Sequence, residues 1–437
     1  MRRLPIVLAA ATGLIVLATA AIGTGVIAIP GAATTGPVAA ASPTPPPTST
    51  PIPTPEPTPP RPTGSPYIAT GIDRPGVAGR LQAALDEGRV ALAAPGIQAS
   101  VIFPDGRQWT GVAGVADLAT GRPLTPDTPF AIASVSKTFL AADVLLLVDA
   151  GLLSLEDAPA RLLPTTLVAG APIDPLITVR MLLDHTSGLG DYLTSRSLDE
   201  AVRADPLAVW TPAQSLAHVG PKAGKPGQGY HYANTNYVLL GLIVEQITGR
   251  TLAAELRARF FEPLALASAS YQGAEPPAAE LPTSYRYSSI RLEAKPQDVT
   301  DGTDIRPFTA ITTATGAAGS LAMSARDLAH WARALYGGLV LPPELLALMI
   351  ADAAVTQTLK PAYPYGLGVQ VFTIDGRITY GHSGRLVGAR SIVRWFPDAG
   401  VAIAIVTNQS RYDTTPILRD MLAIVAPTKT GKGQLAG

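Results

Sequence analysis

The chain has 437 residues, of which 47% are hydrophobic and 15% charged, so it can form a large core and has the composition of a globular enzyme. Its formal net charge is +0 and it has no basic run beyond Arg2-Arg3, which excludes a general affinity for nucleic acid. It has no cysteine, and its five histidines lack metal-ligand spacing, which excludes disulfides and a cysteine nucleophile and predicts neither a metal site nor a cofactor.

Residues 1–41 have the pattern of a targeting segment. Arg2-Arg3 precedes an uncharged apolar stretch from Leu4 to Ile29, and small-residue cleavage candidates lie at 18–20 and 39–41. The stretch could also span a bilayer, which takes about 20 residues. A cleaved signal peptide and a retained membrane anchor both stay open. In either case the positive end stays in the cytoplasm, so we expect the rest of the chain to be extracytoplasmic, either anchored or secreted into the cell envelope.

Residues 42–70 form a linker that is rich in proline and threonine. Such a segment favours polyproline II at roughly 3 Å per residue, so about 25 residues would reach on the order of 75 Å. A spacer of this kind suits an enzyme that works in the cell envelope. The alternative is an unstructured stalk whose reach has no role.

The folded part is expected to begin near residue 73. Residues 77–89 predict a helix, and residues 97–103 and 107–115 predict a hairpin across Pro104-Asp105-Gly106. The apolar run at 138–150, which ends before a glycine, predicts a helix buried on most sides.

Ser134 and Lys137 stand at the start of this buried helix. Positions i and i+3 share a helix face, so the serine hydroxyl and the lysine amine can come within hydrogen-bond reach. A serine is a weak nucleophile until a neighbouring group takes its proton, and a lysine in a dry site can do so. The free N–H groups of the helix start could hold an oxyanion. The alternative is a helix cap beside a solvated lysine.

Asp184-His185-Thr186-Ser187 contains the residue types of a catalytic triad. Near neighbours in sequence cannot converge as a triad does, so we interpret this segment as a helix end and a turn that bounds a cleft. Asp191 and Tyr192, just beyond it, are candidates for contact with substrate. Ser324 and Asp327 have the spacing of a helix capping box.

The end of the chain alternates short strands with turns. Strands are predicted at 366–373, 377–381, 391–396 and 401–408, followed by a helix at 415–425 and a tail at 428–437 that holds Lys429-Thr430-Gly431. Because strands come from both ends of the chain, we predict an α/β (α+β) fold with one antiparallel five-stranded sheet flanked by helices and an inserted, mainly helical domain. The α/β part would comprise residues 73–135 and 316–427, and the helical part residues 136–315.

Two further motifs join Ser134 and Lys137. Tyr232-Ala233-Asn234 lies on a glycine-flanked loop ahead of a predicted helix, and His382-Ser383-Gly384 follows the predicted strand 377–381. In this order, the motifs resemble the serine β-lactamase and penicillin-binding superfamily. The class C-like branch, which also holds D-alanyl-D-alanine carboxypeptidases, D-amino-acid peptidases and β-lactamase-like esterases, matches best. The resemblance covers about residues 73–427 and implies a β-lactamase/transpeptidase-like fold, with the site where its two parts meet.

The resemblance also implies roles for these residues. Ser134 would be the nucleophile that forms an acyl-enzyme, and Lys137 would accept its proton if burial or nearby positive charge lowers its pKa from about 10.4. Tyr232 would be the second acid/base; its alternative is a loop tyrosine that packs on the helix. The residues expected to bind substrate are Asn234, His382, Ser383, Gly384 and Arg385. Asn234 would bond Lys137 and the substrate amide, and the backbone N–H groups of Ser134 and Arg385 would form the oxyanion hole.

His382 stands where many members of the superfamily carry the lysine of a lysine-threonine-glycine motif. Histidine titrates near 6.5. We therefore expect its attraction for a substrate carboxylate to be weak and pH-dependent, with activity on carboxylate substrates falling above about pH 7. This favours peptide, amide or ester substrates over β-lactams.

The sequence thus predicts an extracytoplasmic serine hydrolase that acts through an acyl-enzyme on amide, peptide or ester bonds. D-Alanyl peptides of the cell wall are the leading substrates, followed by esters and then by β-lactams. A catalytically silent penicillin-binding or cell-wall-binding module is the alternative outside enzymes. The expected partners are a small-molecule or peptide substrate, cell-wall peptidoglycan, and the membrane if the N-terminal segment is uncleaved, but no nucleic acid.

Overall fold

The computed structural model describes residues 69–70, 76–169, 171, 173–287 and 295–427. The targeting segment, residues 42–68 of the linker and the tail with Lys429-Thr430-Gly431 lie outside these residues. Among the described residues, no helix combines the length and apolar character that a membrane crossing requires. The described residues all belong to one compact unit. The finer division of the folded part into 73–135 with 316–427, and 136–315, stays a prediction.

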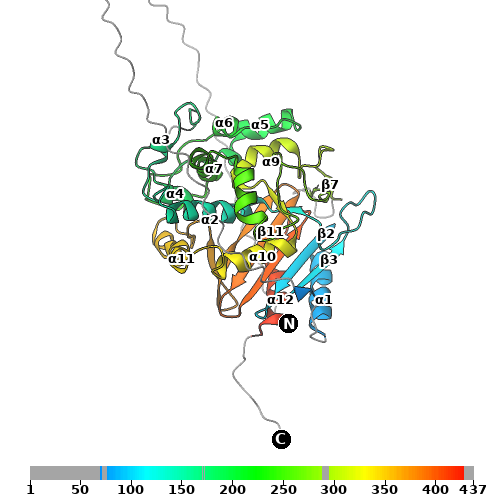
Figure 1. The fold of residues 1–437 in the computed structure, drawn as a ribbon. Helices are drawn as coiled ribbons and strands as arrows, with labels where there is room; N and C mark the ends of the chain where they lie inside the picture. The colour runs from blue at the N-terminus through cyan, green and yellow to red at the C-terminus, as the bar shows by residue number, and fades with distance from the viewer. Residues whose placement is uncertain (1–68, 71–75, 170, 172, 288–294, 428–437) are drawn as a thin grey trace, which may run out of the picture. The chain divides into compact units, whose positions relative to one another are not determined.

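The described residues form a central sheet of seven strands (Figure 1), in the order β1-β3-β2-β12-β11-β10-β9. The strands are β1 (Ala69–Thr70), β2 (Gly96–Ile102), β3 (Arg107–Gly114), β9 (Gln370–Ile374), β10 (Arg377–Leu386), β11 (Ala389–Phe396) and β12 (Val401–Thr407). All neighbours are antiparallel except β1 and β3, which are parallel. The predicted strand count of five is therefore wrong, although the fold class is confirmed. The six predicted strand segments all correspond to strands of this sheet, so the count of five was already one too few. The seventh strand, β1, was missed because a two-residue edge strand carries no periodic signal.

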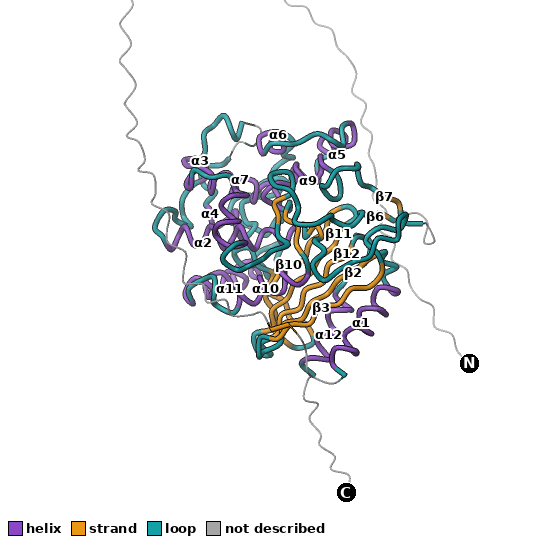
Figure 2. Tube along the Cα trace, turned by 45° about the vertical axis from the view of Figure 1, so that its right-hand side comes forward, coloured by secondary structure: helices purple, strands orange, loops and turns teal. Residues whose placement is uncertain are grey.

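Strands β2 and β12 lie at the middle of the sheet and are buried along their whole length. Helices α1 (Val77–Ala91) and α12 (Thr415–Val425) pack on one face and α10 (Ala325–Tyr336) on the other, as Figure 2 shows from a second direction. Because side chains alternate along a strand, Ile403 and Ile405 face the first pair of helices, while Ala402 and Ala404 join the opposite core.

Two long helices, α2 (Ser136–Asp149) and α7 (Asn234–Thr248), pack against each other and are buried over most of their length. Shorter elements surround them: α3 (Pro159–Leu162), α4 (Val179–Leu183), α5 (Arg196–Ala204), α6 (Pro212–Leu216), α8 (Leu252–Leu256), α9 (Thr309–Thr315) and α11 (Pro343–Thr358). Short strands pair as β4 (Phe130–Ala131) with β8 (Leu321–Met323), β8 with β5 (Ser270–Tyr271), and β6 (Tyr285–Arg286) with β7 (Gln297–Asp298). The predicted first helix, hairpin and closing helix are confirmed to within two residues.

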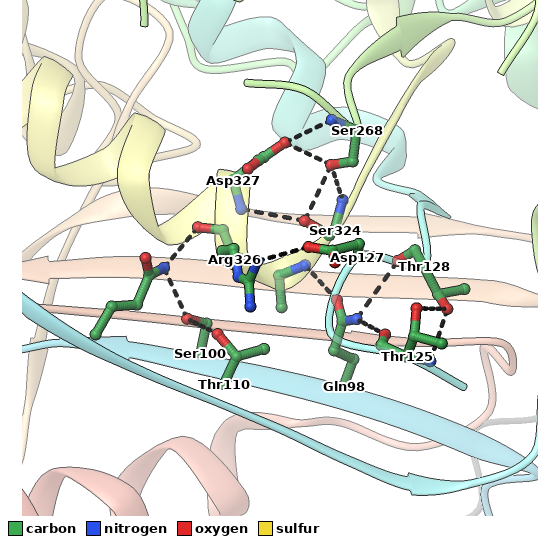
Figure 3. Close-up of polar contacts among 12 residues, drawn as sticks. Gln98, Ser100, Thr110, Thr125, Asp127, Thr128, Ser268, Ser324, Arg326 and Asp327 are labelled. Carbon is green, nitrogen blue, oxygen red and sulfur yellow. Dashed lines mark hydrogen bonds and ion pairs between the residues drawn. The ribbon is translucent and has the colours of Figure 1, made fainter. Parts of the chain in front are cut away.

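A buried polar network joins the sheet to the segment that leads into the site (Figure 3). The amide nitrogen of Gln98 on β2 donates to the carbonyl of Thr125 at 2.7 Å, and its oxygen accepts the Ala325 N–H of α10. Ser324 caps α10 by accepting the Asp327 N–H at 3.2 Å. The predicted capping box is incomplete, because the Asp327 carboxylate accepts from the Ser268 hydroxyl at 2.6 Å and its N–H at 2.8 Å.

Candidate active site

Ser134 lies in a single 3₁₀ turn, Ala133–Val135, between strand β4 and helix α2. The sequence placed it at the helix start; α2 itself begins at Ser136. Ala133, just before the serine, has a φ of 48°, in the left-handed region that costs a non-glycine residue about 1–2 kcal/mol. A strained turn of this kind presents the serine at the end of a strand, ahead of a buried helix.

Lys137 is fully buried and makes three hydrogen bonds. Its Nζ lies 3.1 Å from Ser134 Oγ, 2.8 Å from Asn234 Oδ1 and 2.7 Å from the carbonyl oxygen of Ala318. Burial lowers the pKa of Lys137 to about 7, and the Asp191 carboxylate partly opposes this shift. A neutral amine has two N–H bonds and one lone pair. Of the three partners only the serine hydroxyl can donate, so the two protons match Asn234 and Ala318 and the lone pair matches Ser134.

Tyr232 completes the group. The centre of its ring lies 5.0 Å from Lys137 Nζ. Burial raises the pKa of its phenol, although a hydrogen bond with the Ser134 side chain acts in the opposite direction. The phenol therefore keeps its proton at neutral pH and can donate it. The structure thus brings together the hydroxyl, the amine and the phenol that the three motifs supply.

Asn234 begins helix α7 and connects Lys137 to Asp191. Its Oδ1 accepts from Lys137, while its Nδ2 donates to Asp191 Oδ2 at 3.0 Å and its backbone N–H to Asp191 Oδ1 at 3.1 Å. Asp191 thereby holds the amide in the orientation that offers oxygen to the lysine. The expected contact of Tyr192 with substrate is wrong, because this side chain is buried and its hydroxyl donates to the Ala314 carbonyl at 2.8 Å.

Strand β10 passes beside the nucleophile turn. The motif His382-Ser383-Gly384 lies within this strand, which continues to Leu386 and does not end at residue 381 as predicted. A Cβ atom at Gly384 would lie 2.1 Å from the carbonyl oxygen of Ile132, so only glycine permits this approach. Ser391 on β11 donates to the same oxygen at 2.6 Å. Arg385 therefore follows directly on the residue that touches the turn of Ser134.

The Ser383 side chain is bonded to the neighbouring strand β9, whereas the Arg385 side chain lines a cavity. The Ser383 hydroxyl and N–H both donate to Gln370 Oε1 on the neighbouring strand β9, at 3.3 and 3.1 Å. The Arg385 side chain is exposed and lines a cavity of about 1710 Å³ that also reaches Asp191 and Asn234. The cavity therefore borders Asn234 and Arg385, whereas Ser134, Lys137 and Tyr232 are not among its lining residues.

His382 differs from the expectation of a charged, titrating group. Its side chain is buried, with Nε2 2.9 Å from the Tyr365 hydroxyl and Nδ1 2.6 Å from the Ser383 carbonyl oxygen. Burial lowers the pKa of His382 to about 3, and the charge of Lys137 adds to this shift. The imidazole is therefore neutral across the physiological range. An imidazolium that attracts a carboxylate near pH 6.5 is excluded, because its desolvation would not be offset.

His185 was interpreted from the sequence only as part of a turn, yet it packs directly on Tyr232. The two ring centres are 4.2 Å apart. His185 Nδ1 accepts the Ala233 N–H at 3.2 Å and lies 3.0 Å from Asn236 Nδ2. Burial holds the pKa of His185 well below its usual value, so the ring is neutral. Because Nδ1 accepts the Ala233 N–H, the ring proton belongs on Nε2. His185 has a φ of 62°, in the left-handed region. No local sequence pattern could have revealed its contact with Tyr232, because the two residues lie far apart in the chain.

No set of three or more histidine, aspartate or glutamate side chains among the described residues is arranged to hold a metal ion. The polar groups of the site instead form one connected chain from Asp191 through Asn234 and Lys137 to Ser134. Such an arrangement suits nucleophilic catalysis by the serine with an amine as base.

Comparison with known proteins gives matches along most of the chain. The family model described as Beta-lactamase matches residues 81–426. Penicillin-binding protein 4 of Amycolatopsis lactamdurans is 32% identical over 343 residues, which cover 75% of this chain and 85% of that protein. Esterase EstB of Burkholderia gladioli is 32% identical over 219 residues, which cover 48% of this chain and 55% of the esterase.

Among solved structures, a D-stereospecific amidohydrolase from Streptomyces sp. matches with a TM-score of 0.67 and 28% sequence identity. The match covers 80% of this chain and 99% of the amidohydrolase. The described fold is therefore shared over nearly the whole of that enzyme.

Proposed function

The chain belongs to the beta-lactamase family and is a serine hydrolase, and from this premise we propose that it cleaves amide, peptide or ester bonds through an acyl-enzyme on Ser134. The hydrogen bonding of Lys137 carries the proposal. Two fixed acceptors, Asn234 and Ala318, take the protons of the neutral amine and leave its lone pair for the serine. A pKa of about 7 keeps a large share of this amine neutral at physiological pH.

Acylation follows from this geometry. Lys137 takes the proton of Ser134 as Oγ bonds to the substrate carbonyl carbon and the carbonyl electrons move onto oxygen. The backbone N–H groups of Ser134 and Arg385 are proposed to hold that oxyanion. The protonated phenol of Tyr232 gives its proton to the leaving amine or alcohol as the carbon–heteroatom bond breaks, and the ammonium of Lys137 replaces it. Water then attacks the acyl group, and its proton returns by the same groups to Ser134.

The substrate class is proposed from the similar known proteins and from the residue at position 382 of strand β10. We favour D-alanyl or other D-amino-acid peptides and amides, with esters next and β-lactams third. The likeness to a D-stereospecific amidohydrolase supports the first, and the likeness to an esterase supports the second. β-Lactams stay third, as expected from the sequence, because histidine stands at residue 382 in place of the lysine of the lysine-threonine-glycine motif.

The place of action is proposed from the sequence. Residues 1–41 have the pattern of a targeting segment, and the proline-rich residues 42–70 suit a spacer beyond a membrane. An enzyme held in this way would meet the peptides of the cell wall. Protease accessibility of the intact protein on whole cells tests the location, and resistance of the folded part to added protease until lysis would contradict it.

Turnover should be measured with a D-alanyl-D-alanine peptide, a short-chain nitrophenyl ester and a chromogenic cephalosporin, each with wild type and Ser134→Ala. Intact-mass spectra of quenched reactions should show an acyl adduct in wild type only. We expect the peptide or the ester to be turned over faster than the cephalosporin. An adduct that forms without turnover would instead support a penicillin-binding module. Equal activity in Ser134→Ala would remove the proposed mechanism.

A further inference from the structure

Arginine side chains gather on one wall of the cavity beside the candidate active site. Four arginines line this cavity, and Arg203 forms an ion pair with Asp199 at 2.9 Å. The other three, here called the arginine wall, are Arg286, Arg385 and Arg411. Within the described ranges none of these three forms an ion pair with a carboxylate.

Three segments that are distant in sequence meet to build this wall. The Tyr285 N–H donates to the Asn408 carbonyl at 2.9 Å, which places the segment of Arg286 beside that of Arg411. The Gly388 N–H donates to Ser410 Oγ at 3.1 Å, which joins the turn after Arg385 to the same segment. A Cβ atom at Gly388 would lie 2.7 Å from the Cβ of Ser284, so the turn after Arg385 also contacts the segment that leads to Arg286.

Contacts of the three guanidinium groups with the protein are few. Arg286 makes a 3.4 Å bond to the amide oxygen of Gln297, and Arg411 stacks on the Tyr412 ring with 5.1 Å to its centre. Asp413, the nearest carboxylate along the chain, is bonded to Arg390 at 3.0 Å. Arg385 is exposed, and the wall therefore has donors to spare.

The acidic residues of the same cavity have partners of their own. Asp199 is paired with Arg203, and the others accept protein hydrogen bonds: Asp191 from Asn234, Asp205 from the Leu207 N–H and Asp301 from the Thr309 N–H. Only Asp199 is paired with an arginine, and the other three carboxylates are held by uncharged N–H donors, so among the described residues of the cavity the guanidinium groups left without a carboxylate partner are those of the arginine wall.

We propose that the arginine wall is an anion subsite that selects substrates carrying a carboxylate near the scissile bond. This inference rests on the proposed function and names its substrate class. His382 is neutral and Lys137 is enclosed by its three partners, so neither supplies an accessible charge to the substrate. Arginine stays charged at every physiological pH and binds carboxylates through paired N–H groups. Arg385 places one such charge on strand β10, which passes beside the Ser134 turn.

Matched esters test the subsite on both sides of the scissile bond. On the leaving-group side, m-carboxyphenyl phenylacetate is compared with m-carbamoylphenyl phenylacetate. On the acyl side, mono-p-nitrophenyl glutarate is compared with its carboxamide analogue. For each pair the measured quantity is the ratio of kcat/KM for the carboxylate to kcat/KM for the carboxamide. Wild type should favour the carboxylate about tenfold in at least one pair, and added salt should reduce that ratio.

Arg411→Gln and Arg286→Gln should each reduce the preferred ratio at least threefold, and the double variant further. Arg203→Gln is the matched control, because its guanidinium lines the same cavity but is already paired with Asp199. This control should keep the wild-type ratio. Circular dichroism and the melting temperature of each variant check that it folds.

Two results would overturn the inference while the proposed function stands. One is turnover of the carboxamides by wild type without preference for either carboxylate. The other is an equal fall of the ratio in Arg203→Gln and Arg411→Gln. Absence of all turnover, together with absence of fluorophosphonate labelling at Ser134, would remove the proposed function and the subsite with it.

Discussion

Lys137 Nζ lies 2.8 Å from the Oδ1 atom of Asn234, a residue 97 positions further along the chain. This bond joins the buried helix α2 to the first residue of α7. It takes one proton of the neutral amine, and the Ala318 carbonyl takes the other, so the nitrogen lone pair faces Ser134. The predictions below concern this bond and the groups that hold it in place.

The first prediction concerns pH. Lys137 must be neutral to accept a proton, and burial lowers its pKa to about 7. The kcat/KM for a neutral nitrophenyl ester should therefore rise between pH 5 and 8 with a midpoint near 7, since the base loses its proton over that range. Stopped-flow acylation rates would show the same midpoint. A flat profile over this range would contradict the role of Lys137 as base.

Asp191 should tune that midpoint. Its carboxylate raises the pKa of Lys137 against the effect of burial, and it also orients the Asn234 amide. Asp191→Asn should shift the rising limb of the pH profile to lower pH, because the ammonium loses a stabilising negative charge. It should also lower kcat about 10-fold to 100-fold, the usual size of an orientation effect. A shift toward higher pH would show that Asp191 does not act on Lys137 electrostatically.

Gly384 should tolerate no side chain. In Gly384→Ala the added Cβ would lie 2.1 Å from the Ile132 carbonyl and 2.3 Å from Ser391 Oγ, so strand β10 must move away from the Ser134 turn. We expect at least a 100-fold loss in kcat/KM, because a displacement near 1 Å has effects of about that size. Gly79→Ala is the control: this helical glycine has open space, and the change should stabilise the fold by about 0.5–1 kcal/mol. Near wild-type activity in Gly384→Ala would refute the close approach.

His382 should stabilise the fold through its hydrogen bond with Tyr365, and it should not contribute a charge to catalysis. Its pKa of about 3 keeps it neutral, so His382→Phe should leave the midpoint of the pH profile unchanged between pH 5 and 8. The buried Tyr365 hydroxyl loses its 2.9 Å partner, which should reduce the free energy of unfolding by about 1–3 kcal/mol. Urea denaturation of the two single variants and the double variant with Tyr365→Phe would measure the coupling. A lost ionisation near pH 6.5 in His382→Phe would show that the histidine titrates after all.

His185 should position Tyr232. His185→Asn keeps an acceptor for the Ala233 N–H and suits a φ of 62°, whereas His185→Leu removes the acceptor and strains the backbone. We expect kcat to fall about 100-fold in the leucine variant and less in the asparagine variant, with a smaller change in KM. Because a loss of folded protein would also lower the apparent kcat and leave KM unchanged, the active-site concentration should be titrated with fluorophosphonate. Equal kcat per labelled site in all three proteins would refute the role.

The sequence reached furthest where the relevant geometry is local. Ser134 and Lys137 are three residues apart, and that spacing alone brings hydroxyl and amine together on one helical turn. The hairpin β2–β3 and the helix Thr415–Val425 likewise follow from periodicity over short windows. Strand β9 was less accurate: its first predicted residues include Gly368, whose φ of 77° belongs to a turn, so the strand begins at Gln370.

The sequence by itself determined the residue types, their local spacing and the family to which the chain belongs. Only the tertiary structure decided the charge states: a lysine with a pKa of about 7, a neutral His382, and a histidine at 185 that packs on Tyr232. The physical reason is that a pKa depends on desolvation and on partners supplied by distant segments, and neither exists until those segments pack together.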